Sequence, residues 1–554
     1  MKTMVKEVLD RSIREFVTRK AIVLPENFDY DLVLTKDRAH GDFAANAAFK
    51  LAKLAGERPA LVADELVLLI QKESAGGKAG AIHKVEVAGA GFINFHLLQA
   101  SLAGILPEVH RKDRHYGESD FGNGKKVLIE FVSANPTGPL TIAHGRQAAV
   151  GDCLVRILKA TGHAVKAEYY LNDAGRQMNL LGASLYARYA QAIGQEAPLP
   201  EDGYQGAYLM ELGQKLKFDK GGTLLSLEHS KAVDFCREYA GDEIMKGIRE
   251  DLKAVDVHFD HYFNESSLYE KGSVDQALNE LTDRGFLYEQ DGALWFRSTT
   301  FGDDKDRVVK KTSGEYTYLA PDIAYHKQKF ERGFNWIINL WGPDHHGYIA
   351  RLKAACQAFG YDSSQVDVLI VQLSTLFRQG QPVRMSTRAG EFVTLRELVD
   401  ETGSDAVRFF FLMRKVESHL DFDLDLAKEK SQENPVYYLQ YAHARIASLI
   451  RFAGRPVSPK ADLNFLVSPE ENDLVKCILD FPKALVQASE ALEPFRVADY
   501  LRELAAAFHK FYSAHRVVSE DENLTDARLL LVDAVRIVLR NGLHLLGISQ
   551  PESM

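Results

Sequence analysis

One turn of the chain combines residue types that favour binding of a phosphate group. His144 and Gly145 follow a loop that contains Pro136, Gly138 and Pro139. Proline fixes φ and glycine permits unusual φ values, so this loop is expected to be stiff and irregular. The following residues have helical spacing, and the free N–H groups and the dipole of a helix N-terminus favour negative charge. We therefore expect His144 and Gly145 to lie beside a phosphate.

Two carboxylates are candidates for a shared pocket at the carboxyl edge of the predicted sheet. Glu130 ends a predicted buried strand, and Asp322 follows Tyr318-Leu319-Ala320-Pro321 at a predicted turn into a helix. Two acids that share one pocket repel each other and lose hydration. A bound cation would relieve both costs through charge-assisted hydrogen bonds. A structural alternative stays open, in which Glu130 caps the following loop and Tyr318 belongs to the core.

The elements that position these residues alternate between strand and helix. Residues 126–130, 164–171, 336–341 and 366–372 are predicted strands. The helix after Gly145 carries an apolar stripe at i, i+3, i+4, i+7 and i+8. Its members are Val150, Cys153, Leu154, Ile157 and Leu158. Strands that alternate with helices predict an α/β fold whose parallel sheet binds ligands at its carboxyl edge.

The patterning divides the chain into three expected domains. Residues 1–110 are an expected α+β domain, with helices over 1–20, 41–53 and 59–70 and two strands within 85–97. Residues 111–430 are expected to hold the catalytic sheet, interrupted by a charged helical insertion at about 176–310. Residues 431–554 have helical spacing throughout and predict an all-α bundle.

Composition excludes several classes of protein. The 554 residues are 46% hydrophobic and 26% charged, as in ordinary globular proteins. No run approaches the ~18 apolar residues of a membrane span, and we expect no membrane partner. The four cysteines form no Cys-x-x-Cys pair, so a zinc site or disulfide framework is not expected. The helix over 1–20 contains acids, unlike a transit peptide, and we expect a cytoplasmic protein. A net charge of −10 argues mildly against nucleic-acid binding, although a local basic face can coexist with it.

Asp344, His345 and His346 are the residues most suggestive of a metal ligand set. Adjacent histidines on one turn point in different directions, so a metal site is the weaker interpretation. We therefore predict no metal site. These residues instead belong to a second turn that leaves a strand, from Gly342 to Gly347.

Three motifs resemble the signatures of class I aminoacyl-tRNA synthetases. Residues 139–146 are similar to the first signature, and residues 133–139 resemble the arginyl-tRNA synthetases in particular. The family has His-x-Gly-His where this chain has Thr141-Ile142-Ala143-His144. Residues 341–347 resemble the adenosine-binding turn. Residues 384–388, Arg-Met-Ser-Thr-Arg, stand where the family has Lys-Met-Ser-Lys, with Arg388 as the nearest replacement for the second lysine.

Both ends of the chain resemble the same family. Residues 41–46 and 91–95 are similar to the additional N-terminal domain of arginyl-tRNA synthetases, which touches the corner of the tRNA. Phe92 and Asn94 fall on its contact positions, and an aromatic ring beside an amide suits recognition of an unpaired base. The C-terminal helices are similar to the family's α-helical anticodon-binding domain.

The resemblance implies an arginine–tRNA ligase with a Rossmann-like core. It would use ATP with Mg²⁺, L-arginine and tRNA(Arg), as an expected monomer. The implied catalytic residues are Thr141, His144, Arg384, Ser386 and Arg388. The implied ATP-binding residues are His144, Gly145, Gly342, Asp344, His346 and Met385. The implied arginine-binding residues are Glu130, Ser133, Asn135, Tyr318 and Asp322. The altered first signature leaves open a catalytically impaired, tRNA-binding relative, and a class I synthetase for another amino acid is a third, weaker alternative.

Overall fold

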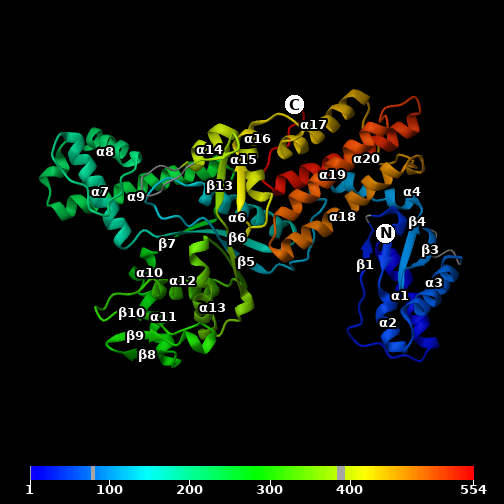
Figure 1. Ribbon diagram of the computed structural model, residues 1–554, viewed down its shortest axis with the longest axis horizontal. Helices are drawn as coiled ribbons and strands as arrows, with labels where there is room; N and C mark the ends of the chain where they lie inside the picture. The colour runs from blue at the N-terminus through cyan, green and yellow to red at the C-terminus, as the bar shows by residue number, and fades with distance from the viewer. Residues whose placement is uncertain (1, 36, 76–80, 384–392) are drawn as a thin grey trace.

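A five-stranded parallel sheet forms the centre of the molecule (Figure 1). Its strand order is β12-β11-β5-β6-β7, and all four pairs are parallel. The strands are β5 (Lys126–Glu130), β6 (Ala164–Leu171), β7 (His261–Asn264), β11 (Trp336–Trp341) and β12 (Val366–Ile370). This computed structural model describes residues 2–35, 37–75, 81–383 and 393–554. The predicted α/β class and four of the five strands are confirmed.

Helices connect these strands and bury one apolar side each. The connecting helices that matter for the site are α6 (Ile142–Ala160), α12 (Leu319–Glu331) and α13 (Ile349–Ala358). The predicted apolar stripe of α6 is fully buried, and α6 packs against α15 (Ser404–Leu412). Since parallel strands end at one edge of a sheet, the turns that leave β5, β7 and β11 lie at a common edge.

The expected helical insertion is wrong in its second half. Residues 176–254 are helical, as α7 (Arg176–Ile193), α8 (Ala207–Lys220) and α9 (His229–Ala254). The chain then returns to the sheet as β7, which pairs with β6 in parallel. A strand of four residues has too little periodicity to predict, and its pairing with β6 depends on residues about 90 positions away in the chain.

A smaller α/β unit follows β7 before the chain reaches α12. It contains α10 (Ser266–Glu270), α11 (Ser273–Asp283) and an antiparallel sheet of β8 (Leu287–Gln290), β9 (Ala293–Phe296) and β10 (Arg307–Lys310). Beyond β12 lie α14 (Leu395–Thr402), α16 (Leu424–Lys428) and a sheet of β13 (Ser374–Arg378), β14 (Gln381–Pro382) and β15 (Leu420–Asp423).

The N-terminal residues fold as helices on an antiparallel sheet of order β1-β2-β4-β3. The elements are α1 (Lys2–Arg19), β1 (Leu32–Leu34), β2 (Phe43–Ala45), α2 (Ala47–Ala55), α3 (Pro59–Ala75), β3 (Ile82–Ala88) and β4 (Phe92–Leu97). The helix expected over 41–53 is wrong at its start, because residues 43–45 form β2. Small residues favour a helix locally, but pairing with β1 and β4 overrides that preference.

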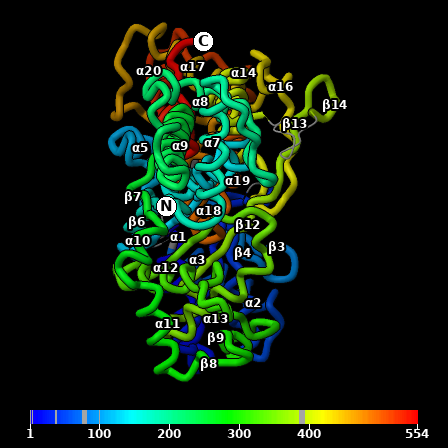
Figure 2. The backbone as a smooth tube through the Cα atoms, turned by 90° about the vertical axis from the view of Figure 1, so that its left-hand side faces the viewer, coloured from blue at the N-terminus to red at the C-terminus, as the bar shows by residue number. Residues whose placement is uncertain are grey.

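Four long helices form the C-terminal bundle. They are α17 (Pro435–Ala453), α18 (Pro469–Ala491), α19 (Phe495–Ala514) and α20 (Glu522–Leu545). Helices α4 (Gln99–Ala103) and α5 (Leu106–Lys112) contact α18 and α20, so the N-terminal sheet adjoins the bundle. Figure 1 shows α7 and α8 at the end of the molecule opposite the N-terminal sheet, and Figure 2 views the molecule from the end that carries α7 and α8. No helix in the described ranges is long and apolar enough to cross a membrane.

Candidate active site

The turn between β5 and α6 fixes the orientation and protonation of His144. The backbone N–H of Thr141, the residue before α6, donates to His144 Nδ1 at 3.1 Å, and the Thr141 hydroxyl lies 3.2 Å from the same nitrogen. Burial lowers the pKa of His144 to about 4, so the ring is neutral at pH 7. Because Nδ1 accepts a hydrogen bond, the proton of the neutral ring is on Nε2. The turn therefore presents Nε2–H as a donor.

The backbone just after β5 is strained. Val132 has φ +67° and Ser133 has φ +39°, although neither residue is glycine. A β-branched residue in this region is rare, and such strain is concentrated at functional sites. The Ser133 hydroxyl donates to Glu130 Oε1 at 3.1 Å and accepts from the backbone N–H of Tyr170 at 3.1 Å. This conformation therefore ties the carboxylate of Glu130 to β6.

Three carboxylates from three elements converge on the side chain of Tyr170. Glu130 ends β5, Glu265 follows β7, and Asp322 lies in the first turn of α12. Burial raises the pKa of the Tyr170 phenol, and the charges of these three acids raise it further. We call Glu130, Glu265 and Asp322 the acid cluster. A cluster of this kind attracts a cationic ligand.

Asp322 is poised between its charged and neutral forms. Burial raises the pKa of its carboxyl to about 7, and the charges of Glu130 and Glu265 act in the same direction. The Tyr348 hydroxyl donates to Asp322 Oδ2 at 2.6 Å and opposes the rise. A cation that binds here would therefore displace a proton from Asp322 near neutral pH.

Glu265 has a similar environment. Burial raises the pKa of its carboxyl, although hydrogen bonds from Tyr170 and Tyr269 oppose the rise. The Tyr269 hydroxyl donates to Glu265 Oε1 at 3.1 Å. The described hydrogen bonds to Asp322 and Glu265 side chains thus come from tyrosines.

Among the described residues, Glu130 and Glu168, unlike Asp322 and Glu265, already have cationic partners. Glu130 pairs with Lys329, whose Nζ lies 2.5 Å from Glu130 Oε2. Glu168 receives two hydrogen bonds from Arg332 and one from Tyr325. Although burial acts in the opposite direction, these bonds hold the pKa of Glu168 at about 2. An incoming cation would therefore pair chiefly with Asp322 and Glu265.

The turn after β11 lies close to α6. A short 3-10 helix, η5 (Pro343–Tyr348), follows Gly342, and Asp344 and His346 are exposed on it. A Cβ atom placed on Gly342 would lie 4.0 Å from Nε2 of Gln147 in α6. No group of three or more His, Cys, Asp and Glu side chains is arranged to hold a metal ion in the part of the chain that the structure describes.

Three family models match consecutive parts of the chain. The model described as the arginyl tRNA synthetase N terminal domain matches residues 3–97. The model described as tRNA synthetases class I (R), catalytic domain, matches residues 106–420, and the DALR anticodon binding domain matches residues 439–554. The chain belongs to the arginyl-tRNA synthetase family.

Similar proteins support this family along the whole chain. The chain is 47% identical to an arginine–tRNA ligase of Bacillus licheniformis, over 99% of each chain. It is 49% identical to arginine–tRNA ligase 1 of Halalkalibacterium halodurans, over 94% of this chain and 93% of that one. A Campylobacter jejuni structure provisionally named an arginyl-tRNA synthetase has a TM-score of 0.77 at 35% identity, covering 83% of this chain and 100% of that one. The Thermus thermophilus arginyl-tRNA synthetase shares the fold, with a TM-score of 0.76 at 22% identity over 100% of both chains.

Among the predicted arginine-binding residues, the structure brings Glu130, Ser133 and Asp322 to one edge of the sheet. Asn135 is half-buried and its amide donates to Gln177 Oε1 at 2.6 Å, at the start of α7. Tyr318 is 73% exposed, so the alternative in which it belongs to the core is wrong, and its role in arginine binding stays a prediction. It precedes α12 rather than lying on the face that carries Asp322, and Tyr348 contacts this acid instead.

The predicted tRNA-contact pair is only half accessible. Phe92 is 46% exposed and packs edge-on against Phe49, with ring centroids 4.9 Å apart. Asn94 is two residues along β4, on the same face, but only 2% exposed. The amide of Asn94 is therefore buried in this structure, and its contact with tRNA stays a prediction. Arg384, Met385, Ser386 and Arg388 lie outside the described residues.

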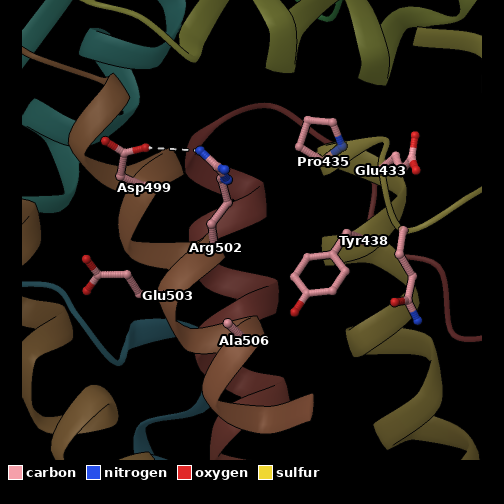
Figure 3. A pocket seen from close by; sticks show the side chains of 8 residues that line it. Glu433, Pro435, Tyr438, Asp499, Arg502, Glu503 and Ala506 are labelled. Atoms are coloured by element: carbon pink, nitrogen blue, oxygen red, sulfur yellow. Dashed lines mark ion pairs between the residues drawn. The ribbon is translucent and has the colours of Figure 1, made fainter. Parts of the chain in front are cut away.

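A groove of about 510 Å³ lies between α17 and α19 in the bundle (Figure 3). Glu433 and Tyr438 line one side, and Asp499, Arg502 and Glu503 line the other. Acids outnumber the single arginine among the labelled side chains, which disfavours an anionic ligand.

The structure adds Glu265, Tyr348 and Lys329 to the residues that the sequence suggested. The sequence does not indicate Glu265 as a site residue, because residues 261–264 are predicted to be part of a helical insertion. The four residues of β7 carry too little periodicity to indicate that a strand ends just before this acid. No local pattern indicates that Tyr348 and Lys329 meet acids from other elements.

Proposed function

We propose that this chain is an arginine–tRNA ligase, which joins L-arginine to tRNA(Arg) at the expense of ATP. The observation that carries the proposal is the acid cluster, which lies at the same edge of the sheet as the helix start that presents His144. A planar guanidinium donates to two carboxylates at once, which a compact ammonium does with poorer geometry. Membership of the arginyl-tRNA synthetase family supports the same substrates.

In the first step, the arginine carboxylate attacks the α-phosphorus of ATP. The bond from this phosphorus to pyrophosphate breaks, and arginyl-adenylate forms without a covalent enzyme intermediate. The Nε2–H of His144 and the N–H groups at the start of α6 would donate to the phosphates. These hydrogen bonds would stabilise the negative charge that develops on the phosphate oxygens in the transition state. Gly342, Asp344 and His346 would contact adenosine, and Mg²⁺ is expected with the bound ATP.

The amino acid would be held at both ends. Asp322 and Glu265 would receive the guanidinium, while Ser133 and Asn135 would lie near the α-amino and carboxylate groups. Fixed donors and acceptors at both ends align the carboxylate for in-line attack. A guanidinium analogue that lacks charge would leave the buried acids poorly paired, and the site would reject it.

In the second step, a hydroxyl of the terminal adenosine of tRNA attacks the arginyl carbonyl carbon and AMP leaves. The N-terminal domain, through Phe92, and the C-terminal bundle are proposed to contact the tRNA. Arg384, Met385, Ser386 and Arg388 are proposed to contact ATP, as their signature implies. We also propose that the protein is a cytoplasmic monomer. Light scattering after size-exclusion chromatography would measure its mass in solution and so test the monomeric state.

The altered first signature has a structural explanation. Thr141 stands at the first histidine position of the family, and its backbone N–H and hydroxyl both approach His144 Nδ1. This capping interaction satisfies helix-terminal groups and fixes the ring that would act on the phosphates. Thr141 therefore supports an active site rather than the catalytically impaired alternative.

An aminoacylation assay with each amino acid and total tRNA tests the function. We expect charging with arginine alone, and charging with another amino acid would contradict the proposal. Exchange between ATP and pyrophosphate, measured with and without tRNA, separates an active enzyme from an impaired relative. We expect exchange that requires tRNA, because activation in this family awaits the tRNA.

A further inference from the structure

The Lys329 side chain is fully buried next to the acid cluster. Its ammonium donates to Glu130 Oε2 at 2.5 Å and to Asn339 Oδ1 at 2.9 Å. It also lies 3.5 Å from His326 Nε2 and 4.2 Å from the ring centroid of Tyr325. A lysine ammonium has three N–H donors, so these three acceptors match its full capacity.

A further hydrogen bond fixes the tautomer of His326, so that its Nε2 is an acceptor. His326 Nδ1 lies 2.9 Å from the carbonyl oxygen of Asp322, which can only accept, so Nδ1 carries a proton. Burial and the charge of Lys329 lower the pKa of His326 well below its usual value, so the ring is neutral. Its Nε2 therefore accepts from Lys329 and from the Asn339 amide, 3.3 Å away.

These contacts join strand β11 to β5 and α12, two of the elements that carry the acid cluster. Glu130 and Asn339 are direct register partners on the neighbouring strands β5 and β11. Asp322, His326 and Lys329 follow one another at i, i+4 and i+7 on α12, and so lie on one face of that helix. Lys329 thus connects two neighbouring strands with the helix that carries Asp322.

The burial of Lys329 limits how it can act. Its side chain is 0% exposed and that of Glu130 is 8% exposed. All three of its donors are engaged, so it acts through its neighbours rather than by touching a substrate. A buried charge that loses its partner is strongly destabilising, so Lys329 also compensates the charge of Glu130.

We propose that Lys329 is a positioning residue for the arginine site, and this inference rests on the proposed function. It holds the Glu130 carboxylate and the α12 face that carries Asp322 at a fixed separation. It also compensates one of the three acids, which leaves Asp322 and Glu265 for the guanidinium of arginine.

The main test compares Lys329→Met and Lys329→Arg with a matched control. Lys327→Met is the control, because Lys327 lies two residues away on α12 and pairs with Glu280 and Glu331 outside the acid cluster. The KM values for arginine, ATP and tRNA are measured in aminoacylation with each full-length variant, together with thermal unfolding. Arginine-induced stabilisation in thermal unfolding gives a second, non-catalytic measure of arginine affinity.

We expect Lys329→Met to raise the arginine KM by roughly 100-fold, the scale of losing one partner of a buried pair. The KM values for ATP and tRNA should change less than about threefold. Lys329→Arg, which keeps the charge and N–H donors, should return the arginine KM to within about tenfold of the wild-type value. Lys327→Met should leave all three KM values unchanged.

Two results would overturn the inference. One is an arginine KM within about threefold of the wild-type value for folded Lys329→Met, and the other is an equal rise in the arginine and ATP KM values. If Lys329→Met does not fold, the double variant Glu130→Gln/Lys329→Met decides, because it contains no unpaired buried charge. Wild-type arginine affinity in that folded double variant would reject the inference. Failure of the wild-type enzyme to charge arginine would instead reject the proposed function, whatever the variants do.

Discussion

At the scale of single residues, His144 is a neutral donor whose proton is placed by the turn that precedes it. Its Nδ1 accepts from the backbone of Thr141, and burial lowers the pKa of the ring to about 4. A neutral imidazole can donate to a phosphate throughout the pH range above that value. This behaviour distinguishes His144 from an ordinary surface histidine, which becomes charged near pH 6.5.

We expect His144→Ala to lower the rate of arginine activation by roughly 10²–10³, the effect of removing one donor that stabilises transition-state charge. The KM for arginine should change little, because His144 is not part of the acid cluster. Single-turnover kinetics of adenylate formation with tRNA present measure both quantities. Thr141→His is the companion variant. It should retain wild-type activity, because the family carries histidine at this position. An unchanged rate in His144→Ala would remove this side chain from the mechanism.

Asp322 should make arginine binding dependent on pH. Its folded-state pKa is raised to about 7, and only the charged carboxylate pairs with guanidinium. Arginine affinity should therefore be full above pH 7 and fall by up to about tenfold per pH unit below it. Asp322→Asn should weaken affinity by about 3–5 kcal/mol and abolish this pH dependence. Calorimetric titration in buffers of different ionisation enthalpy checks the expected proton release, and its absence at pH 6.5 would contradict this assignment.

The same carboxyl should reduce folding stability as pH rises. The folded-state pKa of Asp322 lies above its unfolded value of about 3.9, so the folded protein binds more protons between these pH values. By linkage, the contribution of Asp322 to the free energy of unfolding falls as pH rises from about 4 to 7. We expect Asp322→Asn to unfold at a higher temperature than the wild type at pH 8, with a smaller difference at pH 5. Calorimetry at both pH values tests the sign.

At the scale of elements, α6 approaches the sheet so closely that a methyl group does not fit. A Cβ atom on Gly151 would lie 2.2 Å from Cγ of Phe131, the residue after β5. This contact sets the distance between α6 and the loop that carries the strained Val132 and Ser133. Close packing of this kind transmits a shift of the helix to the site.

We expect Gly151→Ala to destabilise the fold by about 1–3 kcal/mol, as overpacking does, and to lower the activation rate. Gly247→Ala is the matched control, because Gly247 lies within α9 and a Cβ there meets nothing within 4 Å. That control should stabilise the protein by about 0.5–1 kcal/mol through helix propensity. Denaturant unfolding measures both, and equal effects of the two substitutions would contradict the packing argument.

At the scale of the whole molecule, one buried ion pair fastens the N-terminal sheet to the C-terminal bundle. Lys476 in α18 lies 2.8 Å from Asp42 Oδ1, and each side chain is 9% exposed. Lys476 also donates to the carbonyl oxygen of Gly41 at 2.9 Å, and Asp42 Oδ2 accepts from the N–H of Leu97. Gly41 has φ +74° and a Cβ there would meet Phe95 O at 2.6 Å, so the turn requires glycine.

We expect Lys476→Met to raise the KM for tRNA by roughly tenfold or more while the arginine and ATP KM values stay within about threefold. The loss leaves Asp42 buried without its cationic partner, at a cost on the order of 3–5 kcal/mol. Glu108→Gln, which removes an exposed pair with Lys112, is the control and should cost less than about 1 kcal/mol. Steady-state aminoacylation and small-angle scattering test both variants, and equal changes in all three KM values would argue against a role in tRNA positioning.

Elements with strong local patterns were predictable from the amino-acid sequence alone. The proline-rich turn before His144, the stripe of α6 and the apolar runs of β5, β6 and β11 depend on neighbours within a few residues. Their predicted positions agree with the structure for that reason. The family resemblance of short motifs is local information of the same kind.

Which side chains meet depends on how distant elements pack together. Three distant parts of the sequence supply Glu130, Glu265 and the α12 pair Asp322 and Lys329. They come together because β5, β7 and α12 share one edge of the sheet. The short strand β7 carries little periodicity, so Glu265 had no local signal. Lys329 likewise looks like any charged residue of a helix until its three acceptors are known. Contacts of this kind depend on burial and pairing between distant segments, which propensity and spacing do not encode.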